Sequence, residues 1–318
     1  MTNKNNLKIH FLNTIWSDAI LLESNNHYAF VDTGSPFYYP MVNKHLIDLN
    51  IKTIDFIVLT HFHIDHYGNI KSLVNDFKVN KLYLKKYYGL DGSTASGYSS
   101  NDEYIENEFK NYHNILDACK ANNTEVCFVE EMNSNVVNIA FDNFNLELYD
   151  ANNNLYELYS DPCSPFYNQR KFNENFNSMG VFIKVDNNNG NSTNIFLGGD
   201  VSCSKSDVEA INDLSIRMVN NIYKKHNIDH IDIYKSCHHG GGGTNTLELC
   251  QLLKPKYAII TNTDRWLDNY PTYDNLKKGN KDVKILKTDY QKYIFEISDI
   301  INIQTIKEDS LFITLNKN

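Results

Sequence analysis

Arginine is scarce in this sequence. Only Arg170, Arg217 and Arg265 occur, and 39 acidic residues outnumber 30 basic ones, which gives a formal net charge of −9 at pH 7. A surface of this kind repels a polyanion unless a local feature reverses the field. The sequence therefore argues against a protein that binds long nucleic acids.

Several other signatures are absent. The six cysteines are Cys119, Cys127, Cys163, Cys203, Cys237 and Cys250. They form no C-x-x-C pair, which is typical of reduced thiols rather than a disulfide framework. The polar start, Met1 to Asn6, has no basic and apolar leader, and no apolar run approaches bilayer-spanning length. We expect one cytoplasmic domain, 1–318, without a membrane partner; the oligomeric state stays open.

Short apolar runs alternate with helical patterns along the chain. Residues 19–32 predict two strands around a turn that contains asparagine, and Phe56–Leu59 predicts a buried strand before helical spacing at Ile70–Phe77. Later helical patterns lie at Val208–His226 and Thr246–Leu253, and later apolar runs at Val181–Val185, Ile195–Leu197, Ile231–Tyr234, Tyr257–Ile260 and Tyr293–Ile297. This alternation indicates a layered α/β protein. The polar, aromatic range 88–176 is interpreted as an insertion over the active-site face of the core, with a small separate lobe as the alternative.

Three histidines and an aspartate crowd into six residues after the first buried strand. His61 and His63 face the same way in extended backbone, so they can converge on one ion. Asp65 and His66 fall at the start of the following helix, where they can face a second ion. Imidazole and carboxylate ligands suit zinc, with manganese or iron as weaker candidates. The alternative, polar residues that merely end a strand, is hard to reconcile with so many histidines.

Two later apolar runs end in similar residues. One is followed by Gly198, Gly199 and Asp200, where glycine lets the backbone approach a site closely and Asp200 could bridge two ions. The other is followed by His238 and His239. Because strand ends in α/β proteins gather at one edge, we expect these residues to join the histidine cluster. A plain turn is the alternative for the Gly-Gly-Asp motif.

These motifs, in this order, resemble the metallo-β-lactamase fold, an αββα sandwich with a metal site at one edge of two packed sheets. The motif His61-x-His63-x-Asp65-His66 matches the family signature in full. The stretches Ser17–Leu22, Val31–Gly34 and His238–Gly240 are similar to the ComEC-like branch of that family. Leu82–Tyr87 and Leu197–Asp200 resemble the catalytic module of teichoic acid phosphorylcholine esterases, within a similarity that runs from about residue 8 to 265.

The resemblance implies two divalent metal ions, with zinc preferred. The first ion would bind His61, His63 and Asp200. The second would bind Asp65, His66, Asp200 and either His238 or His239, with His239 preferred. Asp32 would support the site without being a ligand. Many relatives supply a further histidine to the first ion, and Asn177 would fill that gap directly or through water.

The activity that the resemblance implies is metal-assisted hydrolysis of a phosphodiester or phosphate ester in a small molecule. Asp65 or Asp200 would orient the attacking hydroxide, and His238 would protonate the leaving group or bind phosphate. Trp16 and Trp266 would offer faces for a quaternary ammonium group, with ordinary packing as the alternative for each. The competing hypotheses are a ComEC-like nuclease, a metal-binding regulatory protein without catalysis, and a lactonase or β-lactamase.

Overall fold

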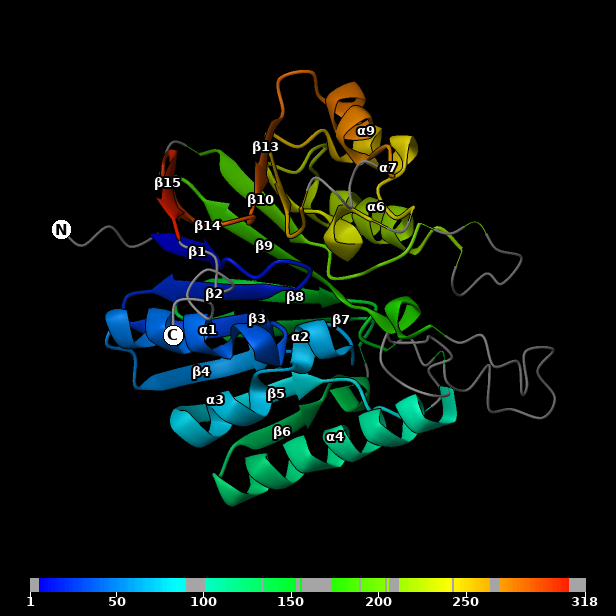
Figure 1. The fold of residues 1–318 in the computed structure, drawn as a ribbon. Coiled ribbons are helices and arrows are strands. Elements are labelled where there is room, and N and C mark those ends of the chain that lie inside the picture. Colours follow the sequence, from blue (N-terminus) through cyan, green and yellow to red (C-terminus); the bar gives the residue numbers. More distant parts are fainter. Residues whose placement is uncertain are drawn as a thin grey trace.

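The chain folds into two β-sheets that pack face to face, with helices on both outer faces (Figure 1). The structure is a computed structural model that describes residues 6–89, 101–132, 134–152, 155, 173–188, 190–203, 205, 212–241, 243–263 and 269–308. Within these residues the layers follow the order helix, sheet, sheet, helix. The αββα sandwich expected from the sequence is confirmed.

The first sheet has eight strands among the described residues. In spatial order they are β15 (Ile301–Lys307), β14 (Gln291–Ile297), β1 (Leu7–Phe11), β2 (Ala19–Ser24), β3 (His27–Thr33), β4 (Thr53–Val58), β5 (Lys78–Leu84) and β6 (Glu125–Phe128). Strands β3 to β6 run parallel to their neighbours in the order β3-β4-β5-β6, whereas β1 pairs antiparallel with β2 and β14. The two ends of the described chain therefore meet in one sheet.

The second sheet has seven strands in the described part of the chain. They are β13 (Lys284–Lys287), β12 (Tyr257–Ile260), β11 (Ile233–Lys235), β10 (Ser192–Leu197), β9 (Gly180–Asp186), β8 (Phe144–Tyr149) and β7 (Val136–Phe141). Strands β10 to β13 are parallel, and β7 to β10 pair antiparallel. The parallel strands of this sheet place their carboxyl ends at one edge.

The helices cover the outer faces. They are α1 (Tyr39–Asp48), α2 (Ile64–Tyr67), α3 (Ile70–Asp76), α4 (Asn101–Ala121), α6 (Leu214–His226), α7 (Leu247–Leu253) and α9 (Thr272–Gly279), with 3₁₀ turns η1 (Pro36–Tyr38), η2 (Val129–Met132), η3 (Glu174–Asn177) and η4 (Cys237–Gly240). None of the described helices has the length and apolar character needed to cross a bilayer.

Alternate residues of each strand serve different layers. In β3, Ala29 and Val31 join the apolar cluster between the sheets, whereas Phe30 joins the cluster beneath the helices. In β10, Phe196 likewise turns outward to the cluster that contains Met218 of α6. Because neighbouring side chains on a strand point to opposite faces, both faces of these strands must be apolar. This explains the continuous apolar runs in the sequence.

Most strands expected from the sequence are present. The pair within residues 19–32 is β2 and β3, joined by Asn25 and Asn26 with φ of 47° and 66°. Two-residue hairpins need positive φ at both turn positions, which asparagine tolerates well. The buried strand before the histidines is β4, and the helical spacing after them is α3.

The range 88–176 differs from the insertion expected over the active-site face. Its described part supplies β6 to the first sheet and β7 and β8 to the second. In β7 the buried residues Val137, Ile139 and Phe141 alternate with more exposed ones, so this strand carries a weak but readable pattern. For α4 and β6 to β8 the insertion is corrected to integral parts of the sandwich. Residues 90–100 and 156–172 lie outside the described residues, and the division into one domain stays a prediction.

Candidate metal centre

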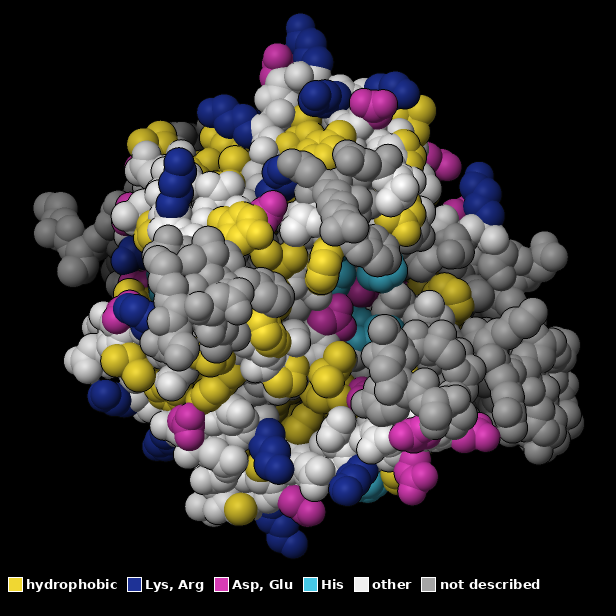
Figure 2. Space-filling view, in the orientation of Figure 1, with side chains coloured by type: hydrophobic (Ala, Val, Ile, Leu, Met, Phe, Trp, Pro, Cys, Tyr) yellow, Lys and Arg dark blue, Asp and Glu magenta, His cyan; other side chains and the backbone are white. Residues whose placement is uncertain are grey.

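The candidate residues follow strands of both sheets. His61 and His63 come after β4, Asp200 after β10, and His238 and His239 after β11. Histidine and acidic side chains meet at the surface in the middle of the face shown in Figure 2, beside hydrophobic side chains. The two sheets therefore bring their polar strand ends to one edge of the sandwich.

The turn before Asp200 needs its glycines. Gly199 has φ of +48°, and a Cβ there would lie 2.7 Å from Oγ of Ser178. The same hydroxyl accepts a hydrogen bond from the backbone N–H of Asp200, at 2.9 Å. A larger residue at position 199 would displace this hydroxyl, so the close approach fixes the backbone that carries Asp200.

The first group of candidate ligands is His61, His63 and Asp200, whose ligand atoms lie within 4.8 Å of one another. Nε2 of His61 is 3.0 Å from Nδ1 of His63 and 3.8 Å from Oδ2 of Asp200. On the other side of the ring, Nδ1 of His61 lies 3.1 Å from the hydroxyl of Thr60. The His61 ring is thus held from behind while Nε2 faces the other two ligands.

The second group gathers around His66, His239 and Asp200. Nε2 of His66 lies 3.4 Å from Oδ1 of Asp200, and Nε2 of His239 lies 3.6 Å from Oδ2 of the same carboxylate. Oδ2 of Asp65 is 3.1 Å from Nε2 of His239 and 3.7 Å from Nε2 of His66. Asp200 therefore belongs to both groups, as a bridging ligand must.

Asp32 supports the second group from behind. Its Oδ2 lies 2.8 Å from Nδ1 of His66 and accepts a hydrogen bond from the Thr60 hydroxyl, while Oδ1 accepts one from the Thr60 backbone N–H. An ionised carboxylate only accepts hydrogen bonds, so Nδ1 of His66 carries the proton. This leaves the Nε2 lone pair directed toward Asp200.

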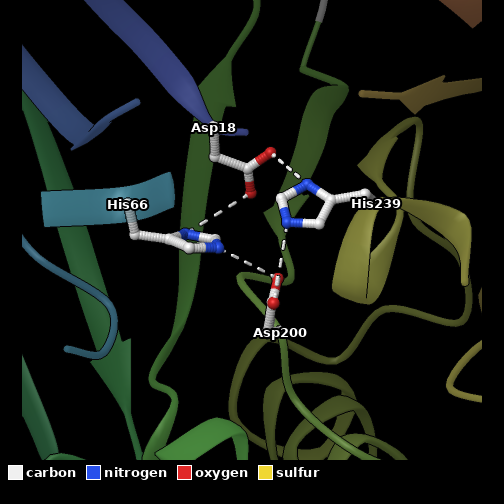
Figure 3. A group of neighbouring side chains, drawn as sticks. All are labelled: Asp18, His66, Asp200 and His239. Carbon is white, nitrogen blue, oxygen red and sulfur yellow. Dashed lines mark ion pairs between the residues drawn. The ribbon is translucent and has the colours of Figure 1, made fainter. Parts of the chain in front are cut away.

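A second carboxylate, Asp18, lies behind His239. Figure 3 shows the rings of His66 and His239 between Asp18 on one side and Asp200 on the other. Oδ1 of Asp18 is 3.2 Å from Nδ1 of His239, and Oδ2 forms an ion pair with Lys235. The group that could hold a metal ion by ligand spacing includes Asp18 together with His66, Asp200 and His239.

These residues fit a divalent cation. Within the described residues, Nε2 of His66 and Oδ1 of Asp200 are buried and have no hydrogen-bond partner. A buried polar atom without a hydrogen bond costs about 1–3 kcal/mol. Here the two atoms face each other as an ion pair at 3.4 Å. Imidazole nitrogen and carboxylate oxygen form the donor set that zinc prefers. A bound cation would satisfy both atoms.

The buried charges shift the pKa values of the histidines in opposite directions. Burial alone would lower the pKa of His239, but the carboxylates of Asp200 and Asp18 outweigh it and raise the pKa to about 9. His66 behaves in the same way, and its pKa rises well above its usual value because of Asp200 and Asp32. Burial and the charge of His66 lower the pKa of His61. A cation in the second group must displace protons to bind.

Three residues at this edge have a strained backbone. Asp32, His238 and His239 have φ of 56°, 49° and 53°, in the left-handed region that non-glycine residues seldom occupy. Strain of this kind persists only where the surroundings enforce it, and it clusters at functional sites. The two consecutive strained histidines direct their side chains to different places.

The two histidines after β11 differ in exposure. His239 is buried between Asp18 and Asp65. The side chain of His238 is 36% exposed, with Nε2 3.8 Å from Oδ2 of Asp200 and 3.4 Å from the amide nitrogen of Asn175. His239 thus sits where a ligand of the second group would be, and His238 lies beside Asp200 with access to solvent.

The remaining sequence candidates have varied surroundings. The amide of Asn177 donates to Glu174 at 3.2 Å and its Oδ1 accepts from Lys85 at 3.3 Å, so both ends of the side chain have partners. The hydroxyl of Ser178 lies 3.4 Å from Nδ1 of His61 instead. Trp16 is 47% exposed and donates its backbone N–H to the Thr261 carbonyl. Trp266 lies outside the described residues.

Sequence reasoning missed three residues that contact the second group. Asp18 stands out in the sequence only as part of the stretch Ser17–Leu22, which is similar to the ComEC-like branch. Neither Lys235 nor Thr261 belongs to a recognisable motif. Lys235 follows directly on the apolar run of β11 and has no exposed surface. A lysine at the end of an otherwise buried strand is the signal that could have found it, because lysine is almost never fully buried unless it is paired.

The comparisons with known proteins agree with this architecture. The Metallo-beta-lactamase superfamily model matches residues 17–113. A UPF0173 metal-dependent hydrolase of Staphylococcus aureus (strain MRSA252) is 37% identical over 82 residues, which cover 23% of this chain and 33% of that protein. The corresponding protein of strain JH9 matches to the same extent. The match thus spans about a third of the length of these curated relatives.

A solved structure covers far more of the chain. The metallo-β-lactamase fold protein YhfI from Bacillus subtilis is 14% identical, with a TM-score of 0.50 over 92% of this chain and 100% of that chain. Two packed sheets with flanking helices, and a His/Asp cluster at the strand ends, accompany this likeness. The chain has the metallo-β-lactamase fold.

Proposed function

We propose that the protein is a metal-dependent hydrolase that cleaves a phosphodiester or phosphate ester in a small molecule. The observation that carries the proposal is the pair of His/Asp groups that share Asp200, with buried Nε2 of His66 and Oδ1 of Asp200 facing each other without a hydrogen bond among the described residues. The curated relatives that match part of the chain are named metal-dependent hydrolases, which supports the first half of the proposal.

Two divalent ions, most readily zinc, would occupy the two groups. His61, His63 and Asp200 would hold one ion, and Asp65, His66, Asp200 and His239 would hold the other. Such a pair supplies a hydroxide at neutral pH and neutralises the oxygens of a phosphoryl group during in-line displacement. Manganese or iron would fit the same ligands less well.

Two side chains beside Asp200 can orient the reacting groups and transfer protons. Asp65 has a carboxylate that is 30% exposed beside both histidines of the second group, so it can orient the attacking water while it holds an ion. His238 is 36% exposed, and its Nε2 lies 3.8 Å from Oδ2 of Asp200 and 3.4 Å from the amide nitrogen of Asn175. In its protonated form His238 would donate a proton to the leaving oxygen; because burial lowers its pKa, binding of the phosphoryl group is the alternative role.

The charge of the loaded centre favours an anion. Its described residues contribute four carboxylates, Asp18, Asp32, Asp65 and Asp200, and one ammonium group, Lys235. Two divalent ions would make the formal charge of this set positive when the histidines are neutral. Because the centre is largely buried, water screens that charge only weakly and the local dielectric constant is low. The charge therefore attracts a small phosphoester. The surrounding net charge of −9 still repels a long polyanion.

Trp16 supports a substrate that also carries a cation, such as phosphorylcholine. Its loop is tied to the ligand helix because the backbone N–H of Asp18 donates to the Asp65 carbonyl at 3.1 Å. The 47% exposed indole therefore lies on a segment held against the centre. An indole face binds a quaternary ammonium group with about 0.5–2 kcal/mol.

The test compares three substrates on the zinc- or manganese-loaded full chain, with metal content measured on the same sample. We expect turnover of p-nitrophenyl phosphorylcholine and bis-p-nitrophenyl phosphate, and little cleavage of single-stranded DNA. The variant Asp200→Ala should lose the activity. Asp282→Ala should keep it, because Asp282 is exposed and precedes β13, at the amino ends of the parallel strands rather than at their carboxyl ends.

Three other outcomes would contradict the proposal. Faster cleavage of DNA than of either small ester would favour a ComEC-like nuclease. Binding of metal without turnover of any substrate would favour a regulatory metal-binding protein. Full activity of Asp200→Ala would remove the bridging ligand from the mechanism.

A further inference from the structure

An ion pair lies fully inside the protein directly behind the candidate metal centre. Lys235 ends β11 between β10 and β12, where it pairs in register with Leu197 and Ile259. Its ammonium group contacts Oδ2 of Asp18 and donates to the Gly199 carbonyl at 3.2 Å. The two side chains are 0% and 1% exposed. Buried charges of this kind are costly unless each has a partner, and here the two side chains are partners of each other.

The hydrogen bonds of Asp18 determine the protonation of His239. The Thr261 hydroxyl donates to Oδ1 of Asp18 at 2.7 Å, so toward His239 this hydroxyl can only accept. Nδ1 of His239 lies 2.9 Å from the Thr261 oxygen and 3.2 Å from Oδ1 of Asp18. Both neighbours are acceptors, and Nδ1 must therefore carry the proton. On the other side of the ring, Nε2 faces Oδ2 of Asp65 at 3.1 Å and Oδ2 of Asp200 at 3.6 Å, so Nε2 is the nitrogen that is directed toward the candidate ligands.

The partners of Asp18 lie on the side of the protein rather than on the side of an ion. Its Oδ1 accepts from Thr261 and faces His239, and its Oδ2 forms an ion pair with Lys235. Asp200 lies farther from that ammonium group, with Oδ1 at 4.0 Å from Nζ of Lys235. Ligand spacing alone groups Asp18 with the metal-binding residues. Its partners place it behind the ring rather than on an ion.

We propose that Asp18 and Lys235 form a charge-balanced positioning pair that holds His239 in the tautomer whose Nε2 binds the second ion. Lys235 balances the charge of Asp18 across their buried contact, and Asp18 orients His239 through Nδ1. Contact of Lys235 with the Gly199 carbonyl and its 4.0 Å approach to Asp200 tie the same pair to the bridging ligand. The inference rests on the metal centre of the proposed function.

The test measures zinc binding and histidine tautomers in the absence of substrate. Asp18→Asn removes one charge, Lys235→Met removes the other, and Asp18→Leu/Lys235→Met replaces both with apolar side chains. Zinc affinities come from stepwise titration of the full chain, tautomers from ¹⁵N spectra of its histidines, and stability from urea unfolding of the zinc-free protein.

We expect both single variants to be less stable than the parent, because each leaves an unpaired buried charge, and the double variant to recover stability. Despite this recovery, the second zinc should bind the double variant about 10- to 100-fold more weakly, the usual effect of losing a carboxylate behind a ligating histidine. The first zinc should bind as in the parent. In the zinc-loaded protein at neutral pH, the ¹⁵N signals of His239 should change from a single Nδ1–H tautomer in the parent to a mixture in the double variant.

A matched control lies at the opposite end of the same strand. Asp232 is 3% exposed and pairs with Lys256 at 2.6 Å. Asp232→Asn should lower stability without weakening either zinc ion or changing the His239 tautomer. This variant separates loss of stability from loss of positioning.

Three results would overturn the inference. Parental affinity for both zinc ions in the double variant would make the pair merely structural. Loss of the second ion from Asp18→Asn with an unchanged His239 tautomer would make Asp18 a ligand. A parent that binds fewer than two zinc ions would remove the second site itself. A parent that binds two ions and cleaves no substrate would contradict the proposed function and leave this inference standing.

Discussion

Two clusters of buried histidines lie in this molecule, and they differ in what satisfies their ring nitrogens. In the closed cluster, formed by His10, Glu23, His45 and Lys292, His10 contacts His45 and Glu23 at 3.0 Å each, and Nδ1 of His45 lies 3.2 Å from Lys292. Every ring nitrogen there has a partner in the protein. At the metal centre, Nε2 of His66 has none among the described residues.

The partners of the ring nitrogens distinguish a candidate metal site from a structural histidine cluster. Both clusters combine histidine with carboxylate, so residue type alone does not separate them. Only the second directs several ligand atoms at one point, and only there do buried lone pairs lack protein partners. A closed cluster stabilises the fold, whereas an open one reserves its lone pairs for a cation.

The largest effect is expected from the ligand that both groups share. Asp200→Ala should abolish binding of both zinc ions and lower turnover of bis-p-nitrophenyl phosphate by at least about 1000-fold, or about 4 kcal/mol in the activation barrier. Zinc analysis and steady-state kinetics on the same preparation measure this. Retention of two zinc ions by the variant would contradict the bridging role.

The next largest effect is expected from a variant that distinguishes the two ligand groups of the metal centre. His63→Ala removes a ligand of the first group only, so the variant should lose one of two zinc ions and keep the other. Competition with a chelator measures how tightly the remaining ion is held. Loss of both ions would contradict this prediction, because it would show that zinc binding at the second group depends on the first.

A smaller effect is expected from the carboxylate behind His66. Asp32→Asn keeps the shape but weakens the hydrogen bond to Nδ1, so the second zinc should bind about 10- to 100-fold more weakly, equal to about 1.4–2.7 kcal/mol. Calorimetric titration gives both affinities. An equal loss at the first ion would point to a general distortion around Thr60 instead.

The closed cluster should respond in stability and leave zinc binding unchanged. Glu23 accepts from Lys8 at 2.7 Å and contacts His10 at 3.0 Å, so Glu23→Gln should cost about 1.5–3 kcal/mol of unfolding free energy. Urea unfolding of the zinc-loaded protein measures this cost. Weaker zinc binding in this variant would break the distinction between the two clusters.

The same variant gives the smallest effect, a dependence on pH. Burial alone would raise the pKa of Glu23, but hydrogen bonds with His10 and Lys8 outweigh it and lower the pKa from 4.5 to about 2. A lowered carboxyl pKa stabilises the fold above the unfolded value and loses that contribution as pH falls. The stability difference between parent and Glu23→Gln should therefore be complete above pH 4.5, smaller by roughly 1 kcal/mol at pH 3.5, and absent near pH 2. Unfolding curves at pH 7, 4.5 and 3.5 check this, and a constant difference would contradict it.

The sequence predicts the sandwich, and it predicts that the candidate ligands meet at one edge, for a physical reason. Candidate ligands such as His61 and Asp200 follow apolar strands closely in the sequence. Parallel strands place their carboxyl ends at one edge of a sheet, so this edge can be predicted before the order of the strands is known. The turn at Asn25 and Asn26 is equally local, because both residues tolerate the φ values that it needs.

What the sequence does not predict depends on pairing across the fold. Asp18 and Lys235 are separated by more than 200 residues and belong to different sheets, so neither residue reveals its partner. The range 88–176 is similar in this respect, since the alternation in β7 is visible but its place beside β8 in the second sheet is not. The sequence does not reveal the closed cluster either, because His45 of α1 contacts both His10 of β1 and Lys292 of β14 only in the folded protein.

The most direct test of the central claim is anomalous X-ray scattering at the zinc edge from crystals of the zinc-loaded protein. We expect two zinc peaks, one in contact with His61 and His63 and one with His66 and His239. Both should be in contact with Asp200. No peak at this edge of the sandwich, or a single peak bound by Asp18, would contradict the claim.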